Sequence, residues 1–130
     1  MEQQPATLRF RPDGTFTIVQ FTDLHWQNGE PADLQTAKLM AEVLDTERPD
    51  LVVLTGDVIY GSDCRDPLKS WSDAVAPIIE RHLPWAAVFG NHDDEGSATR
   101  EQLMAHQMTL LGCLSFPGPA GTSGGPDTVQ

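Results

Sequence analysis

The sequence predicts an α/β domain built on a mostly parallel β-sheet with an opening β-hairpin. Short, uninterrupted apolar runs at residues 51–54 and 85–89 have the composition of strands that are buried on both faces of a parallel sheet. Asp23, Asp57 and Asn91 each follow a hydrophobic run, and consecutive members of this trio are 34 positions apart. One strand, a crossover helix and the next strand occupy about 30 residues or more. We therefore expect these polar residues to meet at one edge of the sheet.

The first element is expected to be a hairpin. Residues 8–10 and 15–21 are rich in β-branched and aromatic side chains, which favour strands. The segment 11–14 between them places Pro, Asp and Gly where a tight turn requires them. The sequence therefore predicts two strands joined by a short turn.

Two helices are expected to cover the sheet. Apolar residues recur at helical spacing over residues 33–47, with Asp33 in the position of an N-cap. A second apolar stripe of helical period covers residues 71–82, and Pro77 inside it removes one backbone hydrogen-bond donor. This second helix is therefore expected to be kinked or to start late.

The last part of the chain is expected to hold one more helix and a tail. A capping box at Thr99 begins a helix that continues to Leu111, and Gly112 can end it in a left-handed conformation. Half of residues 117–130 are Gly or Pro and show no apolar periodicity, which predicts a disordered tail. The folded domain is accordingly expected to span residues 1–116.

Length and charge restrict the classes of function. A chain of 130 residues is expected to form one domain. Its formal net charge of −11 opposes binding to the phosphate backbone of nucleic acids or to anionic membranes. Bound divalent cations would reverse the sign of the charge wherever carboxylates cluster. The acidity is therefore compatible with a metal-mediated phosphate site.

The cysteines and the N-terminus favour a cytoplasmic protein. Cys64 and Cys113 form neither a CxxC pair nor a framework of disulfides, so both are expected to be free thiols. The first residues show no signal-peptide pattern, and no apolar stretch approaches the ~20 residues that span a bilayer.

Three of the polar residues have the chemistry of ligands to divalent metals. A pair of divalent ions about 3.5–4 Å apart requires a bridging carboxylate, and Asp57 is the natural candidate. In an extended chain Asp23 and His25 point to the same side while Leu24 points away, so both can contact one ion. Carboxylate oxygen together with imidazole nitrogen suits Zn, Fe or Mn better than Ca.

The third polar cluster completes the set of candidate residues. Asn91 offers a neutral carbonyl oxygen to a second ion, and the neighbouring His92 can reach the substrate instead of the metal. Asp93 is expected to orient the His92 imidazole and to stabilise its charged form. Each cluster alone is common as a turn or a cap, so their order after three strands carries the metal-site prediction.

The strings FTDLHW, LTGDVIY and FGNHDD resemble the first three signature blocks of the calcineurin-like metallophosphoesterases, the superfamily that includes the purple acid phosphatases. In that family the first block supplies two ligands to one metal, the second the bridging Asp, and the third a ligand Asn and a His that assists the leaving group. The resemblance, which covers about residues 15–94, thus implies metal ligation by Asp23, His25, Asp57 and Asn91. It also implies a catalytic role for His92.

The resemblance implies a fold, cofactors and a substrate class. The family's fold is a β-sandwich of two packed sheets flanked by helices, of which this chain would supply the N-terminal half. Two divalent ions (Mn, Fe or Zn) would bind, and metal-bound hydroxide would attack the phosphorus of a phosphoester in line. No nucleic-acid or membrane partner is expected, and the kind of phosphoester is open.

One part of the family's pattern is missing. The family also uses one isolated histidine and a later G-H-x-H block, but this chain has no His after His106, and neither His82 nor His106 lies in such a block. The chain is therefore either the N-terminal part of a longer enzyme, which we favour, or a reduced relative. A catalytically inactive metal-binding or interaction module is the alternative function, and a fragment that does not fold alone is a third possibility.

Overall fold

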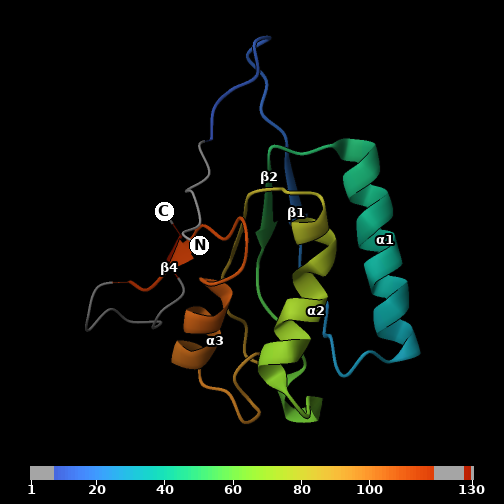
Figure 1. The fold of residues 1–130 in the computed structure, drawn as a ribbon, viewed down its shortest axis with the longest axis vertical. Helices are drawn as coiled ribbons and strands as arrows, with labels where there is room; N and C mark the ends of the chain where they lie inside the picture. Colours follow the sequence, from blue (N-terminus) through green and yellow to red (C-terminus); the bar gives the residue numbers. More distant parts are fainter. Residues whose placement is uncertain (1–7, 119–127, 130) are drawn as a thin grey trace.

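A computed structural model describes residues 8–118 and 128–129 of the chain. Its centre is a parallel three-stranded sheet in the order β1–β2–β3, which confirms the predicted α/β class. Figure 1 shows β1 and β2 of this sheet beside the helices α1 and α2. The elements that form the sheet and its crossovers are β1 (Ile18–Phe21), α1 (Pro31–Glu47), β2 (Leu51–Leu54), α2 (Pro67–Glu80) and β3 (Trp85–Ala87). Each parallel pair is thus joined through one helix, as the 34-residue spacing predicts.

The sheet is in register from one strand to the next. Ile18 of β1 pairs with Leu51 of β2, and Val52 of β2 pairs with Trp85 of β3. All three strands therefore end at the same edge, and the loops that carry the polar clusters begin there.

The core lies on one face of the sheet, under α1 and α2. Val52 and Leu54 of β2 are fully buried together with Leu44 of α1 and Trp71 of α2. The other residues of β2 are half-buried, whereas β3 is buried at every position. Burial on both faces is thus confirmed for β3 but not for β2.

The opening hairpin is not formed. The predicted turn is present, because the Gly14 N–H donates to the Arg11 carbonyl at 2.8 Å and the Arg11 N–H donates to the Thr15 carbonyl at 2.9 Å. Residues 8–10, however, are not in a strand, and β1 begins only at Ile18. β1 instead pairs in parallel with β2, and a short two-stranded hairpin on its own is only marginally stable in water.

Both crossover helices begin earlier than predicted. α1 starts at Pro31, so Asp33 is not the N-cap but the third helical residue, and its carboxylate accepts the Glu30 N–H at 2.9 Å. α2 starts at Pro67 after the N-cap Asp66 and runs without a break through Pro77. Proline is well suited to the first turn because no intrahelical bond is lost there. Pro31 and Pro67 therefore mark the helix starts, and Pro77 does not interrupt α2.

The chain beyond β3 returns along its edge. The short 3₁₀ helix η1 (Gly61–Asp63) lies between β2 and α2. Beyond β3, the helix α3 (Arg100–Gln107) is followed by the strand β4 (Ser115–Phe116), which pairs antiparallel with β5 (Thr128–Val129). The capping box at Thr99 and the left-handed Gly112 are confirmed, although α3 ends before Leu111. Most of the predicted tail, residues 117–130, lies outside the described residues. Among the described residues, no helix is both long and apolar enough to cross a lipid bilayer.

Candidate metal centre

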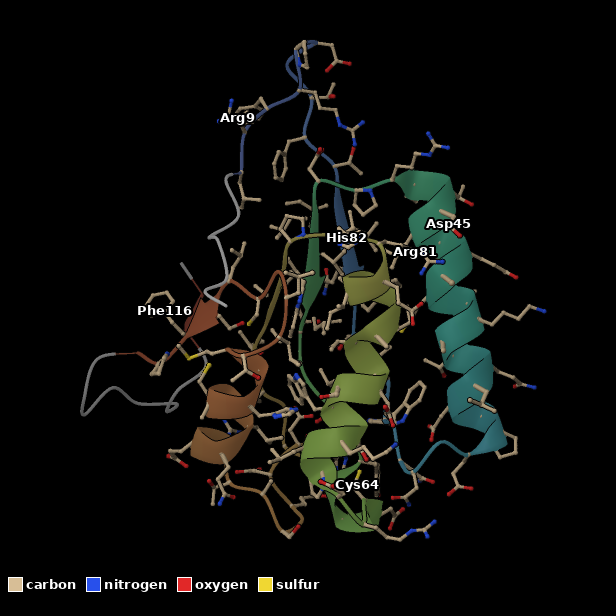
Figure 2. All side chains as sticks on the ribbon, viewed as in Figure 1. Arg9, Asp45, Cys64, Arg81, His82 and Phe116 are labelled. Carbon is tan, nitrogen blue, oxygen red and sulfur yellow. The ribbon has the colours of Figure 1, made fainter. Side chains whose placement is uncertain are left out.

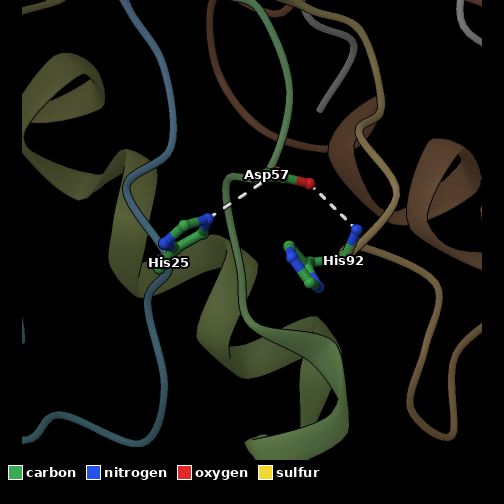
Figure 3. Close-up of side chains that lie close together, drawn as sticks. All are labelled: His25, Asp57 and His92. Atoms are coloured by element: carbon green, nitrogen blue, oxygen red, sulfur yellow. Dashed lines mark hydrogen bonds and ion pairs between the residues drawn. The ribbon is translucent and has the colours of Figure 1, made fainter.

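Three side chains from the three polar clusters converge beyond the carboxyl ends of the strands. His25 follows β1, Asp57 follows β2 and His92 follows β3, and each offers one possible ligand atom within 4.8 Å of the other two (Figure 3). Asp23 adjoins this group, since its Oδ1 lies 3.5 Å from His25 Nε2, and Asp57 Oδ2 lies 3.6 Å from the same nitrogen. The predicted meeting of the clusters at one sheet edge is confirmed for these four residues.

Three of these residues have a strained backbone conformation. Asp23, His25 and Asp57 have positive φ angles of 55°, 50° and 51°, a left-handed conformation that costs a non-glycine residue about 1–2 kcal/mol. Asp23 and His25 are therefore not the extended pair that the sequence predicts. Hydrogen bonds hold the conformation, with the Asp23 N–H donating to the Gly56 carbonyl at 3.1 Å and the His25 N–H to the Asp57 carbonyl at 3.0 Å.

Close backbone approach explains the glycine before Asn91. A Cβ atom at Gly90 would lie 2.1 Å from Asp57 Oδ1 and 2.5 Å from the Asp57 nitrogen. Only glycine therefore lets the third cluster pack directly against the second.

Asp57 is a largely buried, ionised carboxylate. Burial alone would raise the pKa of Asp57, but the His92 N–H, which donates to Oδ1 at 2.9 Å, and the neighbouring Asp23 and His25 side chains bring its pKa below the ordinary value. Among the described residues, no Arg or Lys forms an ion pair with Asp57 or Asp23. Two acidic side chains are thus held close together without an Arg or Lys partner among the described residues.

The His25 imidazole supplies a direct test of metal fit. Its Nε2 is buried and has no hydrogen-bond partner within the described structure, although it lies between two carboxylates. A buried polar atom without a partner is costly. Imidazole nitrogen and carboxylate oxygen are together a suitable ligand set for Zn, Fe or Mn, so these residues fit a divalent cation.

His92 is held by two residues outside the predicted set. Its Nδ1 lies 2.9 Å from Glu95 Oε2, and the hydrogen bond to Glu95 raises the pKa of His92 above its ordinary value. The Tyr60 ring stacks on the imidazole with centroids 4.7 Å apart and an interplanar angle of 20°. The i,i+3 spacing of His92 and Glu95 is a signal in the sequence that could have indicated this contact.

Asp93 contacts backbone atoms instead of the imidazole. Its carboxylate accepts the N–H groups of Gly90 at 2.7 Å, Asp57 at 3.0 Å and Ile59 at 3.0 Å. The side chain is fully buried, and burial raises the pKa of Asp93 to about 6. The expected contact between Asp93 and the His92 ring is therefore replaced by one with Glu95, and Asp93 ties the second cluster to the third.

Asn91 and Asp23, the other two predicted metal ligands, are more exposed than Asp57. Asn91 is an exposed residue between Gly90 and His92, and the Asp23 side chain is 55% exposed. His106 instead joins two helices, since its Nε2 on α3 lies 2.6 Å from Ser72 Oγ on α2.

A parallel α/β sheet with carboxylates and imidazoles gathered beyond its strand ends defines a class of domain that binds metals and ligands at that edge. The model of the calcineurin-like phosphoesterases matches residues 16–121, and the chain belongs to this family.

Relatives with curated names agree with this membership. The chain is 41% identical to "Probable inactive purple acid phosphatase 29" of Arabidopsis thaliana, over 89% of this chain and 33% of that protein. It is 47% identical to "Phosphatase DCR2" of Saccharomyces cerevisiae, over 70% of this chain and 18% of that protein. A "Probable cyclic nucleotide phosphodiesterase" of Psychrobacter arcticus is 31% identical over 85% of this chain and 43% of that protein. The chain thus spans a third or less of the length of the first two relatives.

Proposed function

We propose that this chain carries the metal site of a phosphoester hydrolase with two divalent ions. The observation that carries the proposal is the buried His25 Nε2, which lacks a hydrogen-bond partner among the described residues and lies 3.5 and 3.6 Å from two carboxylates. Family membership supports the same chemistry.

The proposed ligands divide between the two ions. Asp23 and His25 would hold one, Asn91 the other, and Asp57 would lie between both. Bound divalent ions would supply positive charge that polarises a phosphoryl oxygen and activates the attacking water. Asp57 suits this role because its lowered pKa keeps it ionised at neutral pH.

His92 would provide the proton that the leaving oxygen needs. A general acid must carry its proton near the working pH, and the pKa of His92 is raised by Glu95. Asp93, predicted as its partner in catalysis, would contribute by fixing the loops that carry Asp57 and His92, through the N–H groups that it accepts.

Metal content and hydrolysis should be measured on the same preparation. The chain would be loaded with Mn²⁺ or Zn²⁺, dialysed, analysed for metal and assayed with an aryl phosphate. We expect bound metal and turnover, both lost in Asp57→Asn and both retained in Asp45→Asn, which removes an acid from the opposite end of the sheet. A chain that binds no metal and leaves the ester intact would contradict the proposal.

A metal-binding module without turnover is the second candidate. Three relatives, matched over 33%, 30% and 32% of their length, carry the words "Probable inactive" in their names, and this observation favours the module. About one bound ion without hydrolysis would support the module, whereas two ions with turnover would support the enzyme.

The partner and location are proposed on charge and thiol chemistry. A phosphoester is the proposed substrate, and a net charge of −11 disfavours a nucleic-acid backbone as partner. Within the described residues Cys64 and Cys113 are free thiols, which is consistent with the proposed cytoplasmic location.

A further inference from the structure

His92 has a fixed backbone, but its ring needs separate support. The His92 N–H donates to Asp57 Oδ1 at 2.9 Å, and the His92 carbonyl accepts the Gly61 N–H at 2.9 Å. These bonds do not restrain the two side-chain torsions. An acid that must reach a leaving oxygen needs its ring held in one orientation.

Glu95 fixes one nitrogen of the ring. Its Oε2 lies 2.9 Å from His92 Nδ1, and an ionised carboxylate can only accept a hydrogen bond. Nδ1 must therefore carry the hydrogen in this contact. In the neutral ring Nε2 is then left with its lone pair, and in the charged ring Nε2 carries the proton that can be donated.

Aromatic neighbours confine the plane of the ring. Tyr60 stacks on one face of His92 at 4.7 Å, and the edge-to-face contact with His25 has centroids 5.5 Å apart at an angle of 88°. The Tyr60 backbone is held by its N–H, which donates to the Trp26 carbonyl at 2.9 Å, and its ring makes an edge-to-face contact with His25 with centroids 5.6 Å apart. The ring thus has a support on its face, a neighbour at its edge and a hydrogen bond at Nδ1.

The carboxylates nearest in sequence have other partners. Asp93 accepts three backbone N–H groups, and Asp94 pairs with Arg100 at 3.3 Å. Glu95 is therefore the acid that the fold assigns to the imidazole.

We infer that Glu95, with Tyr60 as the stacking support, is the positioning residue of this site: it holds His92 in the Nδ1–H form and directs Nε2 to the reaction. Its catalytic consequence rests on the proposed function, while the placement of the hydrogen does not. Glu95 is not itself expected to touch substrate.

The tautomer can be measured without any activity. Nitrogen-15 correlation spectra of the full chain, recorded where the imidazoles are neutral, distinguish Nδ1–H from Nε2–H for each of the four histidines. We expect His92 in the Nδ1–H form in the wild type and in Glu95→Gln, whose amide oxygen can still accept the bond. Glu95→Ala should move His92 toward Nε2–H. Asp94→Asn is the matched control and should leave the spectrum of His92 unchanged.

Kinetics test the consequence. Glu95→Ala should lower kcat by about 10-fold or more with little change in KM, in the range typical of groups that orient a reacting side chain, and Glu95→Gln should recover most of it. A His92 tautomer that is the same in the wild type and in Glu95→Ala, with backbone spectra showing both chains folded, would overturn the inference. If no variant hydrolyses phosphoesters but the tautomer changes as expected, the proposed function fails and the positioning role of Glu95 stands.

Discussion

The two ends of the sheet treat their carboxylates in opposite ways. At the amino ends of the strands, Asp50 accepts Arg11 Nε at 3.0 Å and the Thr17 N–H at 2.8 Å. Nearby, Arg81 pairs with Asp45 at 2.7 Å, where Figure 2 shows their side chains side by side between the ends of α2 and α1. Both of these acids are matched by a cation, and the pKa of both carboxyls is lowered by these hydrogen bonds.

At the carboxyl ends of the strands the acids have no such cations. Asp23 and Asp57 lie against the same imidazole nitrogen, and among the described residues neither pairs with Arg or Lys. Their backbones are also strained, with φ of 55° and 51°. Strained residues and unneutralised charge persist where the surrounding structure over-determines them, which is typical of functional sites.

The difference indicates where charge serves folding and where it serves binding. At the amino ends, the ion pairs of Asp50 and Asp45 join segments distant in sequence and neutralise both carboxylates. At the carboxyl ends the fold keeps Asp23 and Asp57 close together beside His25, so that one bound cation could contact both acids. The metal-site proposal therefore predicts that substitutions at the carboxyl ends lower metal affinity strongly, whereas substitutions at the amino ends leave it nearly unchanged.

The largest contrast is expected between Asp57→Asn and Asp45→Asn. Asp57→Asn removes the charge that would lie between two ions, so metal affinity and hydrolysis should fall by more than about 100-fold, above the range seen for groups that only support a ligand. Asp45→Asn should change neither. Isothermal titration with Zn²⁺ and an aryl phosphate assay measure both. Equal Zn²⁺ affinities in the two variants would show that the acids at the carboxyl ends of the strands do not bind metal in preference to those at the amino ends.

Gly90→Ala tests whether close packing places Asp57. The new Cβ would meet Asp57 Oδ1 at 2.1 Å and the Asp57 nitrogen at 2.5 Å, so the carboxylate must move. We expect metal affinity to fall by about 10-fold or more, as for other groups that orient a ligand. Gly29→Ala is the control, because its Cβ would meet nothing within 4 Å, although its left-handed φ of 90° adds a backbone strain that Gly90 does not have. A Gly90→Ala variant with wild-type affinity would show that Asp57 is not held by this contact.

Asp93→Ala should affect folding more than the choice of ligand. It leaves three backbone N–H groups without their acceptor, and each buried unsatisfied group costs about 1–3 kcal/mol. We expect the free energy of unfolding to fall by about 3 kcal/mol or more in urea denaturation. Asp94→Asn, next in the chain, should stay close to the wild type. An unchanged denaturation midpoint in Asp93→Ala would mean that water replaces the carboxylate.

The sequence was sufficient for the sheet edge and for the residue types, because the strand composition and the strand spacing are local or periodic signals. It predicted that Asp23, His25, Asp57 and His92 meet, and the structure confirms this. It was wrong about how they meet, since the left-handed turns at Asp23 and His25 are imposed by hydrogen bonds to a loop more than thirty residues away. No pattern within one segment reveals such a constraint.

Side-chain partners within the third cluster were equally hard to predict. Asp93 and Glu95 are chemically similar neighbours, and the adjacent acid was the natural choice for the His92 ring. The structure assigns them differently because Asp93 points into the protein, where it accepts two N–H groups of the loop that follows β2. Tertiary contacts therefore decide which of two acids holds an imidazole, and this information is absent from the order of residues.

The smallest effect is expected in the pH dependence of stability, where the two ends should differ in sign. Burial raises the pKa of Asp93 from 3.8 to about 6, so between these values the folded chain holds a proton that the unfolded chain releases. On account of Asp93 the free energy of unfolding should therefore fall as pH rises through this window. The pKa of Asp50 is lowered by the Thr17 N–H and Arg11, so its contribution is present above 3.8 and is lost as pH falls through the folded value.

Carbon-13 titration of the carboxyl groups measures both directly. Asp93 should titrate near pH 6 and Asp50 below 3.8, and Asp93→Asn should remove the fall in stability between these values while Asp50→Asn leaves it in place. If Asp93 instead titrates with Asp50, the three N–H donors stabilise its charge more than burial opposes it. Asp93 would then resemble the acids at the amino ends. The contrast between the two ends would be confined to Asp23 and Asp57, which lie beside His25 and lack an Arg or Lys partner among the described residues.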